Sequence, residues 1–287
     1  MTQQSAKGTS ALVHKPNSLR VVASGIEGPE GPAIAPDGTL FVVSAASGTV
    51  LAVGKDGAVR EHARTNGRPN GLVFDRDGAM YVADAGRKAI LRISGPGTVE
   101  EFIGRSEGSP LEGPNDLAFL PDGSLIFSDP LRVPLPNPAI SPVYRATMDG
   151  EVERFFSDLA YPNGVAVAAT GDEVLVSEMR AHRIVGLGLG DDMTAVGQRM
   201  VRRFREPAEP DGIAVDSEGR ILVALPGIRS IAVIGARGEF QDLYHVEEWR
   251  PSNLCFGDSD LRTVFVTSES DGAVYSFRHG TRGKELP

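Results

Sequence analysis

Gly28-Pro29-Glu30-Gly31 precedes a short run of apolar residues, and similar four-residue stretches precede five more such runs along the 287-residue chain. The other copies are Arg-Pro-Asn70-Gly, Gly-Pro-Asn115-Asp, Tyr-Pro-Asn163-Gly, Glu-Pro-Asp211-Gly and Arg-Pro-Ser-Asn253. Successive copies are 40 to 48 residues apart. A repeat of this length, built from short strands, is typical of a propeller.

Each repeat continues in the same way after its signature. In the first repeat an apolar run, Pro32–Ala35, leads to a Pro-Asp37-Gly turn, and two further runs follow at Leu40–Val43 and Val50–Val53. Most repeats add an outer run, such as Val59–His62. Short β-branched runs between Gly, Asp and Pro turns indicate strands and hairpins, and no long helical period competes with them.

The last repeat has no outer strand after Phe277, whereas the run Leu19–Ser24 precedes the first signature and belongs to no repeat. Pairing that run with the last repeat would close the ring and remove an exposed strand edge. The prediction is an all-β, six-bladed β-propeller of four-stranded blades, with an N-terminal strand completing the last blade. The propeller would span residues 18–278, between disordered tails at 1–17 and 279–287.

Charge and composition narrow the range of partners. The chain has 29 Lys and Arg against 38 Asp and Glu, a formal charge of −9. An acidic surface of this kind repels nucleic acid and anionic lipid. Cys255 is the only cysteine, the first residues show no signal-peptide pattern, and no run approaches the ~18 apolar residues of a membrane span. We expect a cytoplasmic monomer or small homo-oligomer that acts on a small molecule.

Propeller symmetry would carry the six signatures to one axis, where their oxygen-bearing side chains form a ring. Pro-Asn-Gly and Pro-Asp-Gly are also ordinary turn formers, so turn formation is an alternative, above all for Asn70 and Asn253. Glu30 decides between the two interpretations because glutamate has no special turn preference, yet it occupies the same slot. The ring therefore predicts a binding site.

The chemistry of the ring predicts a cation. Placing Glu30 and Asp211 opposite one another would be costly without a positive charge between them. With the amide oxygens of Asn163 and Asn115 they make a set of oxygen ligands that suits calcium, and also magnesium or manganese. Zinc fits less well because no histidine accompanies the signatures. We expect one divalent cation, with calcium favoured and magnesium, manganese, iron or zinc as alternatives.

Three further acids, Asp84, Asp129 and Glu178, end second strands on the face of the ring. Asp129 comes directly before a proline-rich stretch, Pro130–Pro142, which would be stiff and extended. Asp129 is a candidate for contacting substrate or accepting a proton, and a capped strand end is the alternative. The proline-rich stretch either covers the axial opening or is an elaborated surface loop.

The motifs, taken in order, resemble those of the senescence marker protein/gluconolactonase family, the regucalcin-like lactonases. The similarity runs from about Val21 to Phe277 and rests on Glu-Gly-Pro-Glu30-Gly-Pro, Gly-Pro-Asn115-Asp, Ser-Asp129-Pro, Val-Tyr-Arg, Tyr-Pro-Asn163-Gly-Val-Ala and Pro-Asp211-Gly-Ile-Ala-Val. The resemblance implies a six-bladed propeller that holds one divalent metal through Glu30, Asn163 and Asp211. It implies a further ligand or substrate contact at Asn115, and hydrolysis of a cyclic ester whose carbonyl the metal polarises.

The chain departs from that family at several positions. Regucalcin-like members have an arginine two residues before the Asn115 slot to grip a sugar, and here that position is Gly113. The second-strand ends Ala45 and Ala224 are small and apolar. A less polar lactone or ester therefore fits as well as a sugar lactone. The fourth repeat also resembles strictosidine-synthase-type propellers, a wider group that includes non-hydrolytic enzymes.

The leading hypothesis is a metal-dependent hydrolase of a small-molecule lactone or ester. In this hypothesis Asp211 or Asp129 activates water, and Asn115 completes the metal shell or orients the substrate. The alternatives are a lyase, isomerase or cyclase using the same site, and a non-catalytic binding propeller.

Overall fold

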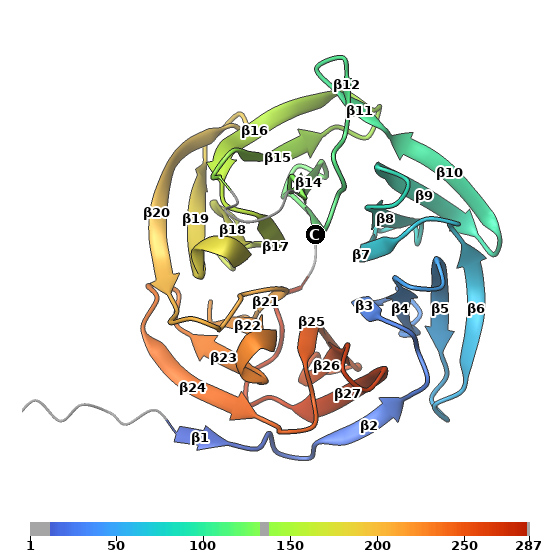
Figure 1. Ribbon diagram of the computed structural model, residues 1–287, viewed down its shortest axis with the longest axis vertical. Helices are drawn as coiled ribbons and strands as arrows, with labels where there is room; N and C mark the ends of the chain where they lie inside the picture. The colour runs from blue at the N-terminus through green and yellow to red at the C-terminus, as the bar shows by residue number, and fades with distance from the viewer. Residues whose placement is uncertain (1–11, 133–137, 286–287) are drawn as a thin grey trace, which may run out of the picture.

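The computed structural model describes residues 12–132 and 138–285. Six sheets surround a central axis, each running from an inner strand to an outer one (Figure 1). The prediction of an all-β, six-bladed propeller is confirmed. Within the described residues, helix is limited to two single 3-10 turns, η1 (Met179–Ala181) and η2 (Pro226–Ile228), and none is long and apolar enough to cross a bilayer.

The strands of each blade are antiparallel neighbours in chain order, with the first strand innermost. Blades one to three comprise β3 (Pro29–Ile34), β4 (Leu40–Ser44), β5 (Thr49–Val53) and β6 (Val59–Arg64); β7 (Pro69–Phe74), β8 (Met80–Asp84), β9 (Ala89–Gly95) and β10 (Thr98–Ile103); and β13 (Leu117–Phe119), β14 (Leu125–Ser128), β15 (Ser141–Ala146) and β16 (Val152–Leu159). Blades four to six comprise β17 (Pro162–Val167), β18 (Glu173–Glu178), β19 (Arg183–Leu189) and β20 (Ala195–Arg203); β21 (Ile213–Val215), β22 (Ile221–Leu225), β23 (Ser230–Ile234) and β24 (Phe240–His245); and β25 (Pro251–Gly257), β26 (Thr263–Ser268) and β27 (Ala273–Arg278). A two-stranded ribbon, β11 (Arg105–Ser106) and β12 (Ser109–Pro110), lies outside the blades.

The ring closes as expected. Strand β2 (Arg20–Ala23) pairs antiparallel with β27, placing Arg20 opposite Ser276 and Val21 opposite Tyr275. It supplies the outer strand that the sixth repeat lacks.

The N-terminal side of β2 differs from the expected tail. Strand β1 (Leu12–His14) pairs in parallel with β24, the outer strand of blade five. The His14 imidazole lies 3.2 Å from an Asp242 carboxylate oxygen and packs edge-on against the ring of Tyr244. This strand could not be predicted from the repeat pattern because it is short and belongs to no repeat.

The C-terminal stretch also differs from the expected tail, since its described residues pack against the hairpin face. His279 is buried, with Nε2 3.3 Å from Asp216 Oδ2. The Lys284 amino group donates to the carbonyl oxygens of Val167 and Ala168 at 3.3 and 3.0 Å. Main-chain oxygens at the ends of inner strands thus find donors in this segment, which holds it in place.

The core consists of six clusters of buried apolar side chains, one at each boundary between neighbouring blades. In the cluster between blades one and two, for example, Val43 of β4 and Val82 of β8 are both fully buried. Burying both faces of every blade in this way needs no covering helix. The blades are thereby held at a fixed angle around the axis.

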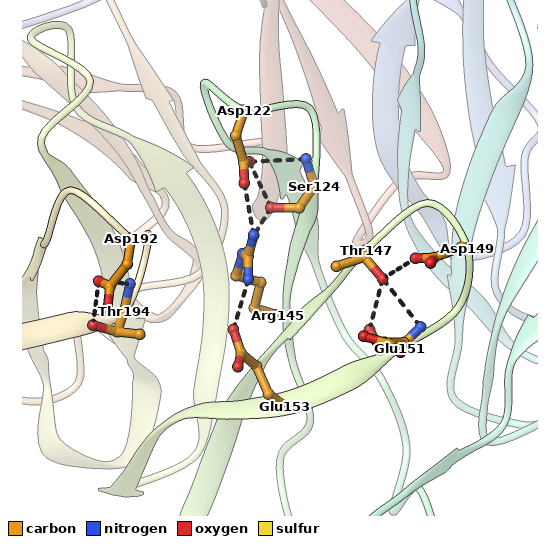
Figure 2. Close-up of polar contacts among 9 residues, drawn as sticks. All are labelled: Asp122, Ser124, Arg145, Thr147, Asp149, Glu151, Glu153, Asp192 and Thr194. Atoms are coloured by element: carbon orange, nitrogen blue, oxygen red, sulfur yellow. Dashed lines mark hydrogen bonds and ion pairs between the residues drawn. The ribbon is translucent and has the colours of Figure 1, made fainter.

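Hairpins between first and second strands carry the turn residues. In blade three Asp122 accepts from the Ser124 backbone N–H and hydroxyl at 3.0 and 2.6 Å. The Arg145 guanidinium donates to Asp122 and to Glu153 at 2.6 and 2.7 Å, which ties the hairpin to the outer strand (Figure 2). Asp122 thus serves the turn, in contrast to the acids of the signatures.

Candidate functional site

Hydrogen bonds join the signatures of neighbouring blades around the axis at five of the six blade boundaries. Each bond runs from one blade to a main-chain oxygen of the next signature. They are Gly71 N–H to Asn115 O (2.7 Å), Ser128 hydroxyl to Asn163 O (2.7 Å), Ser177 hydroxyl to Asp211 O (2.6 Å), Gly212 N–H to Ser252 O (2.9 Å) and Ser252 hydroxyl to Pro29 O (3.3 Å). The six repeats therefore converge as the period predicts.

The glycine after the polar residue of a signature is required by this packing. A Cβ atom at Gly31 would lie 2.2 Å from Asn70 O, and one at Gly164 would lie 2.3 Å from Asp211 O. Real Cβ atoms do not approach backbone oxygens so closely, so the neighbouring blade would have to move. Glycine is needed here because it allows the two backbones to approach closely.

The turn alternative for Asn70 and Asn253 is wrong. Asn70 lies inside β7 and Asn253 inside β25, each in a strand paired with the next one out. In both blades the register shifts within the signature, between Pro69 and Leu72 and between Pro251 and Leu254. A bulge of this kind redirects a side chain without ending the strand.

Glu30 and Asp211, from blades one and five, are buried at the ring, with 5% and 8% of their surfaces exposed. Burial raises the pKa of Glu30 well above its ordinary value, and the charges of Glu269 and Asp116 add to the shift. Burial likewise raises the pKa of Asp211 well above its ordinary value, and the largest charge contribution comes from Glu30. The two carboxylates thus lie within electrostatic range of one another.

The two amides expected beside them are also buried, each about 4% exposed. The Asn163 amide nitrogen lies 3.9 Å from Met179 Sδ, which leaves its carbonyl oxygen for another partner. Asn115 is held by its backbone, because its N–H donates to Ser128 O at 3.0 Å and its carbonyl accepts from Gly71. Blades three and four thus contribute one amide each.

The donor set fits a hard cation in its chemistry. Among the described residues neither Glu30 nor Asp211 has a basic side chain within ion-pair distance, although the more distant Arg250 lowers the pKa of Asp211. Burial raises the pKa of both carboxylates, and the charge of Glu30 raises that of Asp211 further. A cation between them would offset this excess of negative charge. The described part of the chain holds no group of three or more His, Cys, Asp or Glu side chains arranged for a metal. The predicted ligand set has only two carboxylates, and its remaining ligands are amide oxygens.

Two further acids near the ring were missed by the sequence reasoning. Asp116 is buried, and burial raises its pKa to about 6 although its oxygens accept from the backbone N–H groups of Leu117 and Val165. It occupies the slot that is glycine in four other signatures, and this departure is the signal that could have identified it. Glu269 lies in the loop between β26 and β27, where no repeat marks it.

Asp129 is held by the loop that precedes the inner strand of its blade. Its carboxylate accepts from the backbone N–H groups of Glu112 and Gly113 at 2.9 and 2.7 Å. Asp84 and Glu178 do the same in their blades, accepting from the N–H groups of Arg68 and Ala160 at 2.6 and 2.9 Å. These contacts favour the capped-strand interpretation of Asp129.

The proline-rich stretch after Asp129 is described only in part, since residues 133–137 lie outside the described residues. Its two ends are tied together, because the Asp129 N–H donates to Pro142 O and the Leu131 N–H to the Ser141 hydroxyl. The expectation that it covers the axial opening stays a prediction.

A cavity of about 1050 Å³ extends from the ring toward the hairpin face. Gly31, Asp116 and Asn253 line it at the ring, and Lys284 and Glu285 line it at the hairpin face. The inner strands form its apolar wall. The acidic ring thus lies between this cavity and the loops of the opposite face.

The fold and the site together define the class of protein: a closed six-bladed propeller with buried carboxylate and amide side chains at its axis. A family model described as the SMP-30/Gluconolactonase/LRE-like region matches residues 5–270, and the chain belongs to this family. The resemblance read from the motifs is thereby confirmed.

Individual relatives are distant. The chain is 25% identical to a gluconolactonase of Zymomonas mobilis over 56% of this chain and 49% of that protein. It is 27% identical to a diisopropyl-fluorophosphatase of Loligo vulgaris over 63% of this chain and 62% of that protein. The chain therefore spans about half to three fifths of the length of these curated relatives. A calcium-binding protein, regucalcin, from Agrobacterium tumefaciens shares the fold with a TM-score of 0.83, at 17% identity over 96% of this chain and 98% of that one.

Proposed function

We propose that the chain is a metal-dependent hydrolase of a small-molecule lactone or ester. One divalent cation, calcium in the first place, would be held by the oxygens of Glu30, Asn163 and Asp211, with Asn115 as a further ligand or a substrate contact. The single observation that carries this proposal is the pair of buried carboxylates from blades one and five, both with a raised pKa, and with the charge of Glu30 adding to the shift of Asp211. The relatives named gluconolactonase and diisopropyl-fluorophosphatase, and a calcium-binding regucalcin of the same fold, support it.

Each residue has a role that its surroundings allow. When bound, the cation would supply a Lewis acid for the carbonyl oxygen of the ester. Asp211 is the favoured proton acceptor for the attacking water, since Asp129 has both carboxylate oxygens engaged by backbone N–H groups. Asn115 would orient the substrate through its side-chain amide. Asp116, beneath the ring, would keep the signature of blade three in register by accepting from Val165.

The test is elemental analysis of the purified protein, followed by a panel of lactones and esters with the native ion restored. We expect about one divalent ion per chain, and hydrolysis that incorporates one oxygen from labelled water. A lyase, isomerase or cyclase would incorporate none. Absence of any bound cation would favour a non-catalytic binding propeller.

Matched variants test the ligands. Glu30→Gln and Asp211→Asn keep the shape of each side chain but remove its charge, so each should abolish activity and lower the metal content. The fold, measured by circular dichroism, should persist. Each substitution removes one of two buried like charges, which does not lower the stability of the folded state. Full activity in metal-stripped Glu30→Gln would contradict the proposal. A cytoplasmic location and a monomeric or small oligomeric state stay predictions.

A further inference from the structure

Two arginine side chains share one tyrosine ring between blades three and four. The guanidinium carbon of Arg132 lies 5.6 Å from the centroid of the Tyr161 ring, and that of Arg180 lies 5.5 Å from it. Arg132 Nη1 also donates to the Tyr161 hydroxyl at 2.5 Å. The Tyr161 ring thus holds two positive charges near one another, and their repulsion is unfavourable unless a negatively charged group offsets it.

The cluster of Arg132, Tyr161 and Arg180 adjoins Asn163, one of the candidate metal ligands. Tyr161 directly precedes Pro162 and Asn163, and Arg180 follows Met179, whose sulfur contacts the Asn163 amide. Arg180 belongs to η1, in the loop between the second and third strands of blade four. The cluster therefore lies on the face where the loops enter the inner strands.

Arg132 fills the space that Gly113 leaves open, two residues before Asn115. A Cβ atom at Gly113 would lie 3.0 Å from Arg132 Nε, and Arg132 Nη2 donates to Gly113 O at 3.3 Å. The cationic group beside Asn115 thus comes from the loop after β14. A Cβ atom at position 113 would force the Arg132 side chain to shift by a few tenths of an ångström.

Neither guanidinium forms an ion pair with a described carboxylate, although the charge of Arg132 lowers the pKa of the more distant Asp129. In the same blade as Arg180, the Arg183 Nε lies 2.5 Å from a Glu178 carboxylate oxygen. Within the described ranges no carboxylate lies within 4.0 Å of Arg132 or Arg180, in a chain whose formal charge is −9. Both side chains are exposed and can reach a ligand.

The backbone at Tyr161 is strained. Its φ is +57°, a left-handed conformation that a bulky residue rarely adopts. The Tyr161 carbonyl accepts from the Met179 N–H at 3.1 Å, which holds the conformation in place.

The cluster presents donors. Both guanidiniums have N–H groups left over, and the Tyr161 hydroxyl accepts from Arg132 while keeping its own proton to donate. A fork of N–H donors matches the oxygens of a carboxylate or phosphate. We propose that Arg132, Tyr161 and Arg180 form an anion-binding subsite, and that the substrate is a lactone or ester carrying a carboxylate or phosphate group. This inference rests on the proposed function for its reaction, but not for its binding step.

The kinetic test compares two substrates, γ-butyrolactone and the same lactone carrying a carboxylate at its γ-carbon, which differ by one anionic group. The wild-type protein should have the lower KM for the carboxylate. Arg132→Gln and Arg180→Gln should each raise that KM about tenfold, since a charge-assisted hydrogen bond is lost. The kcat for either lactone, and the KM for the neutral one, should stay within about twofold because the reacting ester is untouched. Arg64→Gln, an exposed arginine in β6 paired with Glu61, is the matched control for the loss of one positive charge.

A binding test separates this inference from the proposed function. The full chain without added cation is titrated calorimetrically with succinate and, separately, with inorganic phosphate, so that neither anion binds through a metal. Binding of either probe that is lost in Arg132→Gln/Arg180→Gln supports the subsite even if no lactone is hydrolysed, and the probe that binds more tightly identifies the anionic group. Equal KM values for the two lactones together with no binding of either probe, or binding and KM values unchanged in the double variant, would overturn it.

Discussion

At the scale of single residues, the partners of a buried carboxylate decide what it can do. Asp129 and Asp211 are both buried and both have raised pKa values. Asp129 accepts from two backbone N–H groups of its own blade, whereas Asp211 faces the charge of Glu30 from another blade. The first arrangement holds a loop in place, and the second is suited to binding a cation.

We expect Asp129→Ala to lower the free energy of unfolding by about 2 kcal/mol, because the buried N–H of Gly113 and the partly buried N–H of Glu112 lose their acceptor. Asp129→Asn keeps one carbonyl oxygen and should cost about half as much. Urea denaturation measures both values. If Asp129→Asn left stability unchanged but reduced kcat by about a thousandfold, Asp129 would be a proton acceptor in the reaction instead.

At the scale of elements, the signature is a bulged strand start packed against its neighbour. Bulges recur within the signatures of β3, β7, β17 and β25. Glycine after the polar residue lets the next blade approach, so the four residues that carry the proposed ligands also set the spacing between blades.

Gly164→Ala tests this spacing. The new Cβ would lie 2.3 Å from Asp211 O, so the variant should lose about 2–3 kcal/mol of stability and bind calcium more weakly as Asp211 shifts. Gly280→Ala is the control, since its Cβ would meet open space and should change stability by less than about 0.5 kcal/mol. Thermal unfolding and calcium titration measure the two effects. Equal stability of the two variants would show that the blades adjust freely.

Closure by β2 is the second element that can be tested. A chain starting at Gly25 lacks β2 and leaves the β27 edge unpaired, so it should lose about 3 kcal/mol or more and aggregate. A chain starting at Ser18 lacks β1 and the Asn17 carbonyl that accepts from the Arg278 N–H, but keeps β2, and should remain monodisperse. Urea denaturation and light scattering distinguish them. A stable, monodisperse chain starting at Gly25 would show that the ring closes without this strand.

At the scale of the whole molecule, the axis concentrates negative charge that the fold must compensate. Glu30 and Asp211 bind protons more tightly in the folded protein than in the unfolded chain, since their pKa values are raised on folding. The free energy of unfolding of the metal-free protein should therefore fall as pH rises from about 4, the unfolded value, toward the raised folded values.

Calcium should remove this dependence by stabilising the ionised carboxylates. We expect the Tm of chelator-treated protein to be lower at pH 8 than at pH 5, and excess calcium to restore it at pH 8. Differential scanning fluorimetry across this range measures both. A Tm that does not respond to calcium at pH 8 would contradict a cation at the axis.

Repetition alone determined the architecture, because six signatures at a nearly constant spacing can only meet around one axis, and an unpaired run before the first repeat supplies the strand that the last repeat lacks. Local pattern could not determine what lies outside the period. Strand β1, the docked stretch around Lys284, the placement of Asp116 and Glu269, and the position of Arg132 over Gly113 each depend on contacts between residues far apart in the chain. Tertiary structure decided these because hydrogen bonds and charges act across space, and only the closed ring brings their partners together.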